Sequence, residues 1–134
     1  MIGYERTSLK ALVEQTARQF NLQIRPDPEP EQGHYYRSDH FSLARVGVPS
    51  FSIGLGRNYL GKPAGWGEKA YIDYNEKHYH QPSDQFDPSW DFSGLAELAR
   101  FGYALGSEVA ALPQLPSWQP GDEFLPARQK SWGQ

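Results

Sequence analysis

The chain has 134 residues, no cysteine, and 13 Lys and Arg residues against 16 Asp and Glu residues. This length fits one domain or part of one, and the net charge of -3 excludes a strongly basic nucleic-acid binder. The absence of cysteine excludes disulfide scaffolds, thiolate nucleophiles and Cys-ligated metal sites, and no apolar run is long enough for a membrane span or a signal peptide.

Apolar side chains three and four residues apart predict an amphipathic helix over residues 8–20. A short strand is expected at residues 22–25, where a proline ends it. Ser38 is a suitable N-cap for a short helix over residues 39–46. The apolar residues that follow predict a buried strand over residues 48–55, so helix and strand alternate as in an α/β fold.

Residues 56–90 show neither the period of a helix nor that of a strand. Such long irregular stretches are usually functional or disordered, and the many aromatic side chains here argue against disorder. We therefore expect a long ordered loop that carries a site. Beyond it, Asp91 is a suitable cap for a long helix over residues 92–111. The proline-rich segment after that helix predicts an extended arm, anchored by Trp118, Phe124 and Trp132.

Two histidines of the loop, His78 and His80, are two residues apart and would share one face of an extended segment. With Asp84 and Asp87 they could form a small metal site of their own. A chance spacing on a polar loop, with Asp84 capping a turn, explains the same residues. A glycosidase-type carboxylate pair among Asp73, Asp84 and Asp87 is a further option, without a supporting motif.

Ser38, Asp39 and His40 are the three residue types of a hydrolytic triad, but adjacent residues of a helix do not face each other. The capped start of a helix explains this segment better. The aromatic loop offers another kind of site, because its rings could stack on a peptide or a glycan. The same rings could equally hold the loop together.

Three segments in this order resemble the C-terminal part of the di-zinc aminopeptidases of peptidase family M28: Tyr36–Phe41 followed by Gly47–Pro49, then Tyr79–Asp84, then Asp87–Asp91. The resemblance runs over nearly the whole chain. It implies the C-terminal part of a three-layer α/β/α zinc-peptidase domain, a mixed sheet flanked by helices, over residues 1–112. Residues 113–134 would then form a C-terminal arm that contains Pro and Trp.

The resemblance also implies roles for single residues. The family's late His-x-Pro-x-Asp segment contains a zinc ligand, which corresponds to His80, and an Asp that braces the loop, which corresponds to Asp84. The residues implied at the wall of the pocket are Ser38, Asp39, His40 and Tyr79.

The rest of the family's site is not in this sequence. The family uses an early His-x-Asp pair, a bridging Asp, a Glu-Glu pair that includes the general base, and a further Asp. This chain has no Glu-Glu and no His before His34. A catalytic zinc needs about three protein ligands, and hydrolysis needs a base. We therefore expect no catalytic residue in this chain, little stability, and no activity without the missing N-terminal portion of the domain.

Two functions remain as alternatives. The first is a zinc-dependent aminopeptidase that hydrolyses N-terminal residues from peptides, with two zinc ions in the complete site and one ligand from this chain. The second is an inactive fragment or interaction module that binds a peptide or a glycan through the aromatic loop. Neither nucleic acid nor a membrane is expected as a partner. Complete relatives are often exported, although we expect no signal peptide in these residues.

Overall fold

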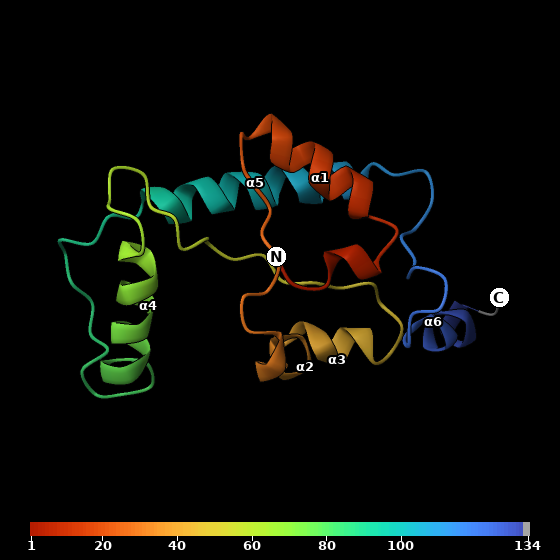
Figure 1. Ribbon diagram of the computed structural model, residues 1–134. Coiled ribbons are helices and arrows are strands. Elements are labelled where there is room, and N and C mark those ends of the chain that lie inside the picture. The colour runs from red at the N-terminus through yellow and green to blue at the C-terminus, as the bar shows by residue number, and fades with distance from the viewer. Residues whose placement is uncertain (133–134) are drawn as a thin grey trace. The chain divides into compact units, whose positions relative to one another are not determined.

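The computed structural model describes residues 1–132 and consists of helices joined by extended and irregular segments (Figure 1). The described chain divides into two compact units: unit 1 comprises Met1–Gly54 and Glu97–Gln134, and unit 2 comprises Leu55–Ala96. The elements in chain order are the 3-10 helices and α-helices η1 (Tyr4–Arg6), α1 (Lys10–Gln19), η2 (Pro30–Gln32), α2 (His34–Arg37), α3 (His40–Ala44), α4 (Trp66–Lys77), α5 (Ser93–Ala110) and α6 (Leu125–Trp132).

The predicted α/β fold, with its mixed sheet, is wrong: the described residues contain no strand. Residues 48–55 pair with another segment at one point only, where Ser52 and Ile2 exchange two backbone hydrogen bonds of 3.1 Å. A strand needs a continuous ladder to a neighbour, and the described chain supplies one bridge here. The alternation of apolar residues still indicates the side that faces the core, because Phe51 and Ile53, both partly buried, pack against the core of unit 1.

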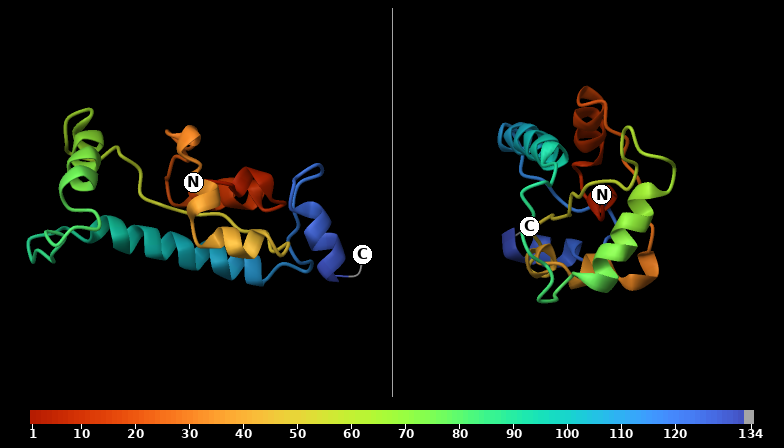
Figure 2. Two further views of the ribbon diagram at one scale, coloured as in Figure 1. Left: turned by 90° about the horizontal axis from the view of Figure 1, so that it is seen from below. Right: turned by 90° about the vertical axis from the view of Figure 1, so that its left-hand side faces the viewer.

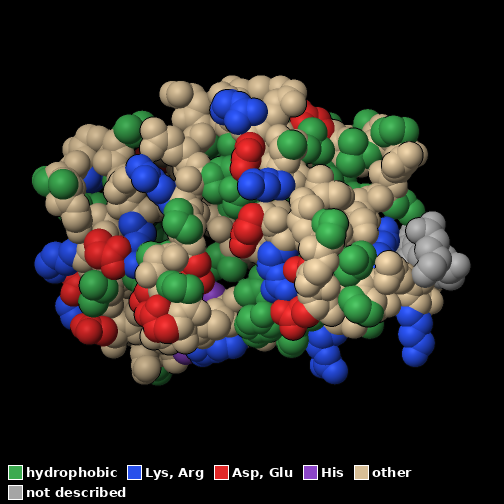
Figure 3. Space-filling model, turned by 45° about the vertical axis from the view of Figure 1, so that its right-hand side comes forward, with side chains coloured by type: hydrophobic (Ala, Val, Ile, Leu, Met, Phe, Trp, Pro, Cys, Tyr) green, Lys and Arg blue, Asp and Glu red, His purple; other side chains and the backbone are tan. Residues whose placement is uncertain are grey.

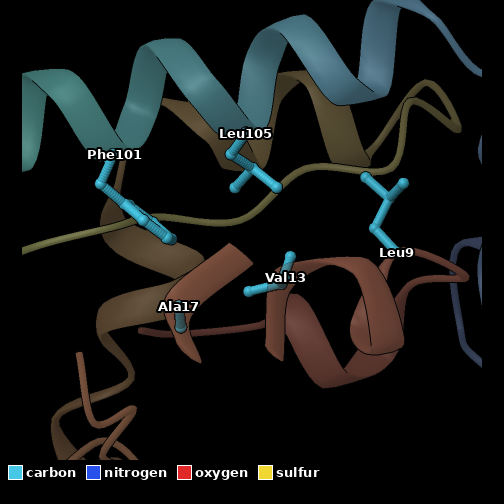
Figure 4. Packing of buried hydrophobic residues seen from close by; sticks show 5 residues of the cluster. All are labelled: Leu9, Val13, Ala17, Phe101 and Leu105. Atoms are coloured by element: carbon cyan, nitrogen blue, oxygen red, sulfur yellow. The ribbon is translucent and has the colours of Figure 1, made fainter. Parts of the chain in front are cut away.

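The helices predicted over residues 8–20 and 92–111 are confirmed as α1 and α5. Within unit 1, α1 and α5 lie side by side (Figure 1 and Figure 2). Their apolar stripes meet in one core because i, i+4 and i+8 positions share a helix face. The buried residues of this core are Leu9, Val13, Ala17, Phe101 and Leu105 (Figure 4).

A second core in unit 1 involves the segment after Pro113, which the sequence predicts as an extended arm. Trp118 and Phe124 are buried there against Tyr35 and Ala44. The Trp118 indole Nε1–H donates to the Gly47 carbonyl at 3.0 Å. This segment is not extended throughout, because it continues into α6. Residues 133 and 134, and the side chain of the predicted anchor Trp132, lie outside the described part of the chain.

An ion-pair cluster ties the same segment to the N-terminal residues. The Arg6 guanidinium is 2.8 Å from a carboxylate oxygen of Asp122 and 2.8 Å from one of Glu123. It also lies over the rings of Tyr35 and Phe124, at 4.6 and 4.9 Å from their centroids. Charge and ring contacts therefore add to the burial of Trp118 in fixing this part of unit 1.

Unit 2 contains α4, in a stretch predicted as loop. Ion pairs four residues apart, from Asp73 to Lys69 and to Lys77, stabilise this helix. Gly67 allows its first turn to approach the preceding segment, since a Cβ there would lie 2.1 Å from the Arg57 carbonyl oxygen. Gly67 is also the one buried residue of unit 2.

Hydrophobic side chains remain exposed over much of the surface, among charged ones (Figure 3). In unit 2 this exposed set includes Leu55, Tyr59, Leu60, Trp66, Tyr71, Ile72, Tyr74, Tyr79, Phe86, Trp90, Phe92 and Leu95. No described helix is both long enough and apolar enough to cross a bilayer.

Candidate functional site

The residue implied as a metal ligand, His80, lies in the segment that connects α4 to α5 in unit 2. The helix ends where the backbone N–H groups of His78 and Tyr79 both donate to the Tyr74 carbonyl, at 2.8 and 2.9 Å. His80 then adopts a left-handed conformation, with φ of 57°. This conformation is uncommon for a residue other than glycine, and surrounding contacts must hold it.

Several hydrogen bonds close the loop around His80. The Tyr74 hydroxyl donates to Asp84 Oδ2 at 2.9 Å. The Ser83 hydroxyl donates to the Lys77 carbonyl at 2.7 Å, and His78 Nδ1 lies 3.2 Å from the Ser83 carbonyl oxygen. The hydrogen bond to Asp84 raises the pKa of Tyr74, so the phenol keeps its proton and remains a donor near neutral pH.

The His80 imidazole is exposed and stacks on the Tyr79 ring, with centroids 3.9 Å apart and planes inclined by 21°. The described residues show no hydrogen bond to its ring nitrogens, which remain available to a ligand from outside. Tyr79, His80 and Asp84 therefore belong to one closed loop, as their places in the sequence predict.

The other carboxylates considered as ligands have local partners. Asp87 Oδ1 accepts the Ser89 backbone N–H at 2.8 Å, and Asp91 Oδ1 accepts the Ser93 N–H at 2.8 Å. These backbone hydrogen bonds lower the pKa of both carboxyl groups. Asp91 thus forms a turn just before α5, whose first helical hydrogen bond is accepted by the Phe92 carbonyl and not by the predicted cap residue. Asp73 pairs with two lysines along α4.

A complete metal site is not formed within the described part of the chain. No group of three or more His, Cys, Asp or Glu side chains is arranged there to hold a metal ion. A protein zinc site usually takes four ligands, of which at least three are side chains. The residues present therefore do not fit a zinc ion by themselves, and His80 supplies one donor of such a set.

Ser38, Asp39 and His40 belong to unit 1 and carry local roles there. The predicted short helix is confirmed as α3, which begins after Asp39. The predicted N-cap role of Ser38 is wrong, because its hydroxyl donates back to the His34 carbonyl at 2.7 Å and no side-chain hydrogen bond caps α3. The His40 ring meets the Tyr35 ring edge to face, with centroids 4.7 Å apart. Its Nε2 is buried without a hydrogen-bond partner among the described residues, and burial lowers the pKa of His40.

The sequence does not show the role of Tyr74, or that Phe86 and Trp90 of the aromatic loop group with Phe92 in an aromatic triad. Phe86, Trp90 and Phe92 contact one another with ring centroids 5.9 to 6.3 Å apart, although all three are exposed. A sequence signal for α4 exists in the spacing of Lys69, Asp73 and Lys77, and Tyr74 is found only once that helix is recognised. The triad has no such signal.

In a comparison with protein families, the model of Peptidase family M28 matches residues 1–101. The matched range contains His80 and the whole connection from α4 to α5. It ends within α5, so Trp118, the Arg6 partners and α6 lie beyond it. Comparison with curated proteins and with solved structures gives no match.

Proposed function

The chain belongs to peptidase family M28, and from this membership we propose that it takes part in the zinc-dependent removal of N-terminal residues from peptides. Its contribution is His80, as one zinc ligand of the complete site. Asp84 braces the loop of this ligand, and Tyr79 shapes the wall of the substrate pocket. The other ligands and the general base come from the N-terminal portion of the same domain.

The observation that carries this proposal is the state of His80. It lies in the range matched by the family, its imidazole is exposed, and no described residue forms a hydrogen bond with its ring. A neutral imidazole with free nitrogens is a preferred zinc ligand. The stacking of Tyr79 restricts the ring, so the ligand is oriented before metal arrives.

The native protein, isolated from the cells that make it, tests the proposal. We expect an intact mass above the 15.2 kDa of this chain, bound zinc, and release of N-terminal residues from peptides. A chelator should abolish the release and added zinc should restore it. In that protein His80→Ala should lower activity by at least about 100-fold, the upper range for loss of a group that supports a metal ligand.

A matched control is His34→Ala, which removes an imidazole from unit 1, outside the proposed site. This variant should keep its zinc and its activity. A native protein without zinc, or one in which His80→Ala leaves activity unchanged, would contradict the proposal.

The exposed aromatic triad supports a second candidate, an interaction module that binds a peptide or a glycan. Phe86 is 70% exposed although it stacks on Phe92. Aromatic faces of this kind offer a large apolar contact area at low conformational cost. Saturable binding of a peptide or an oligosaccharide by the native protein, weakened in Trp90→Ala and without turnover, would favour this role over the peptidase.

A further inference from the structure

We propose that Tyr74 is a positioning residue that holds His80 in place, through hydrogen bonds at both ends of the segment 78–84. The inference rests on the proposed function only for the role of His80 as a zinc ligand. That Tyr74 sets the position of His80 depends on contacts within unit 2.

The first contact is through the backbone at the start of the segment. The Tyr74 carbonyl accepts the N–H groups of both His78 and Tyr79, at 2.8 and 2.9 Å. Two donors on one acceptor fix the direction in which the chain leaves α4. The next residue is His80, which has a left-handed φ of 57°.

The second contact is through the side chain at the end of the segment. The Tyr74 hydroxyl donates to Asp84 Oδ2 at 2.9 Å, four residues beyond His80. The Tyr74 ring also lies 6.1 Å from that of Tyr79, and the Tyr79 ring stacks on His80 at 3.9 Å. Tyr74 therefore restrains the backbone on both sides of His80. It also restrains the Tyr79 ring, on which the His80 imidazole stacks.

The left-handed conformation of His80 makes these restraints necessary. For a residue with a Cβ, this conformation is less favourable than the right-handed one. Such a residue persists only where its surroundings over-determine it. Burial supplies little here, because Gly67 is the one buried residue of unit 2. Hydrogen bonds and ring contacts must therefore order the segment, and the phenol of Tyr74 supplies the one to Asp84.

The test uses nuclear magnetic resonance of His80 in the 134-residue chain. The stacked Tyr79 ring should shift the His80 ring protons upfield of their random-coil positions. In Tyr74→Phe, which keeps the aromatic ring and removes the hydroxyl, we expect that displacement to be lost. The helix signal in circular dichroism should stay unchanged, so the effect is not a general loss of structure.

Two further variants make the test specific. Asp84→Ala should reproduce the loss, and combining it with Tyr74→Phe should add nothing, as for two partners in one interaction. Tyr71→Phe removes a hydroxyl from the same helix and should leave the His80 signals unchanged.

The proposal is overturned if Tyr74→Phe leaves the His80 signals unchanged, if Tyr71→Phe moves them equally, or if those signals are already at random-coil positions in the unmodified chain. None of these readings involves zinc or peptide cleavage. Failure of the peptidase proposal therefore leaves this result standing, and the reverse is also true.

Discussion

Unit 1 and unit 2 are stabilised in different ways. Unit 1 has two clusters of buried side chains, one between α1 and α5 and one around Trp118. Unit 2 buries Gly67 alone, and its contacts are surface ion pairs along α4, the hydrogen bonds of the segment 78–84 and stacking between exposed rings. Packing therefore specifies unit 1, whereas polar and ring contacts at the surface specify unit 2.

The difference places the candidate site in the part of the chain with the least packing. Segments with few buried apolar contacts open locally at low free energy, and binding residues are often drawn from them. Imidazole and aromatic side chains remain accessible in unit 2 for this reason. The comparison predicts that equal substitutions in the two units have unequal effects on stability.

The largest expected contrast is between two phenylalanines. Phe101 is fully buried against α1, whereas Phe86 is 70% exposed. Phe101→Ala should lower the free energy of unfolding by about 3–5 kcal/mol, because it removes a buried ring and leaves a cavity. Phe86→Ala should change it by no more than about 0.5 kcal/mol. Urea unfolding followed by circular dichroism measures both, and equal losses would contradict the comparison.

A smaller contrast is expected between two glycines with positive φ. A Cβ on Gly47, at φ of 90°, would lie 2.4 Å from the Arg128 backbone nitrogen, whereas Gly61, at φ of 74°, has no atom within 4 Å of that position. Gly47→Ala adds a clash with backbone to the conformational cost and should destabilise by about 2–4 kcal/mol. Gly61→Ala carries only the conformational cost, about 1–2 kcal/mol. Thermal unfolding that ranks the two in the reverse order would show that Arg128 does not pack on Gly47 in solution.

The smallest expected effect is a loss of stability in acid that comes from unit 1. Burial lowers the pKa of His40. Hydrogen bonds to the Glu123 carboxylate, chiefly from the Tyr36 hydroxyl and then from the Arg6 guanidinium, lower the pKa of Glu123. Both groups have a higher pKa in the unfolded chain than in the folded one. As the pH falls, the unfolded state therefore binds protons first, and the free energy of unfolding decreases. The loss should begin below about pH 6.5 for His40 and below about 4.5 for Glu123.

Two variants separate these windows in measurements of unfolding against pH. His40→Gln should remove the slope that begins below about pH 6.5, and Glu123→Gln should reduce the slope at lower pH. A slope that survives unchanged in both variants would assign the acid sensitivity to other groups.

Sequence reasoning found the helices whose stability comes from apolar spacing. Leu9, Val13 and Ala17 mark one face of α1, and Phe101 and Leu105 mark one face of α5, so the periodicity was sufficient. The sequence does not reveal the helix α4 because it buries no apolar side chain and is stabilised by charged pairs. The α/β fold was wrong because alternation indicates which side chains face the core, and it cannot supply the neighbouring strand that a sheet requires.

The candidate site could be predicted only where neighbours in sequence are also neighbours in space. The resemblance to family M28 is confirmed by the family match, and it pointed to His80 and Asp84 within one short loop. Their common partner Tyr74 lies ten residues before Asp84, and its role depends on where α4 ends. Such a contact can be predicted only once the helix α4 and the residue at which it ends are known.

The burial of Trp118 has an optical consequence. Of the three tryptophans whose side chains are described, Trp118 is 3% exposed, whereas Trp66 and Trp90 of unit 2 are 40% and 47% exposed. An indole shielded from water emits at shorter wavelength and is poorly reached by a dissolved quencher. Acrylamide should therefore quench the fluorescence of the tryptophans in unit 2 and leave the fluorescence of Trp118 largely unquenched. The short-wavelength component of the tryptophan fluorescence therefore reports whether the C-terminal segment is bound at Gly47 through Trp118.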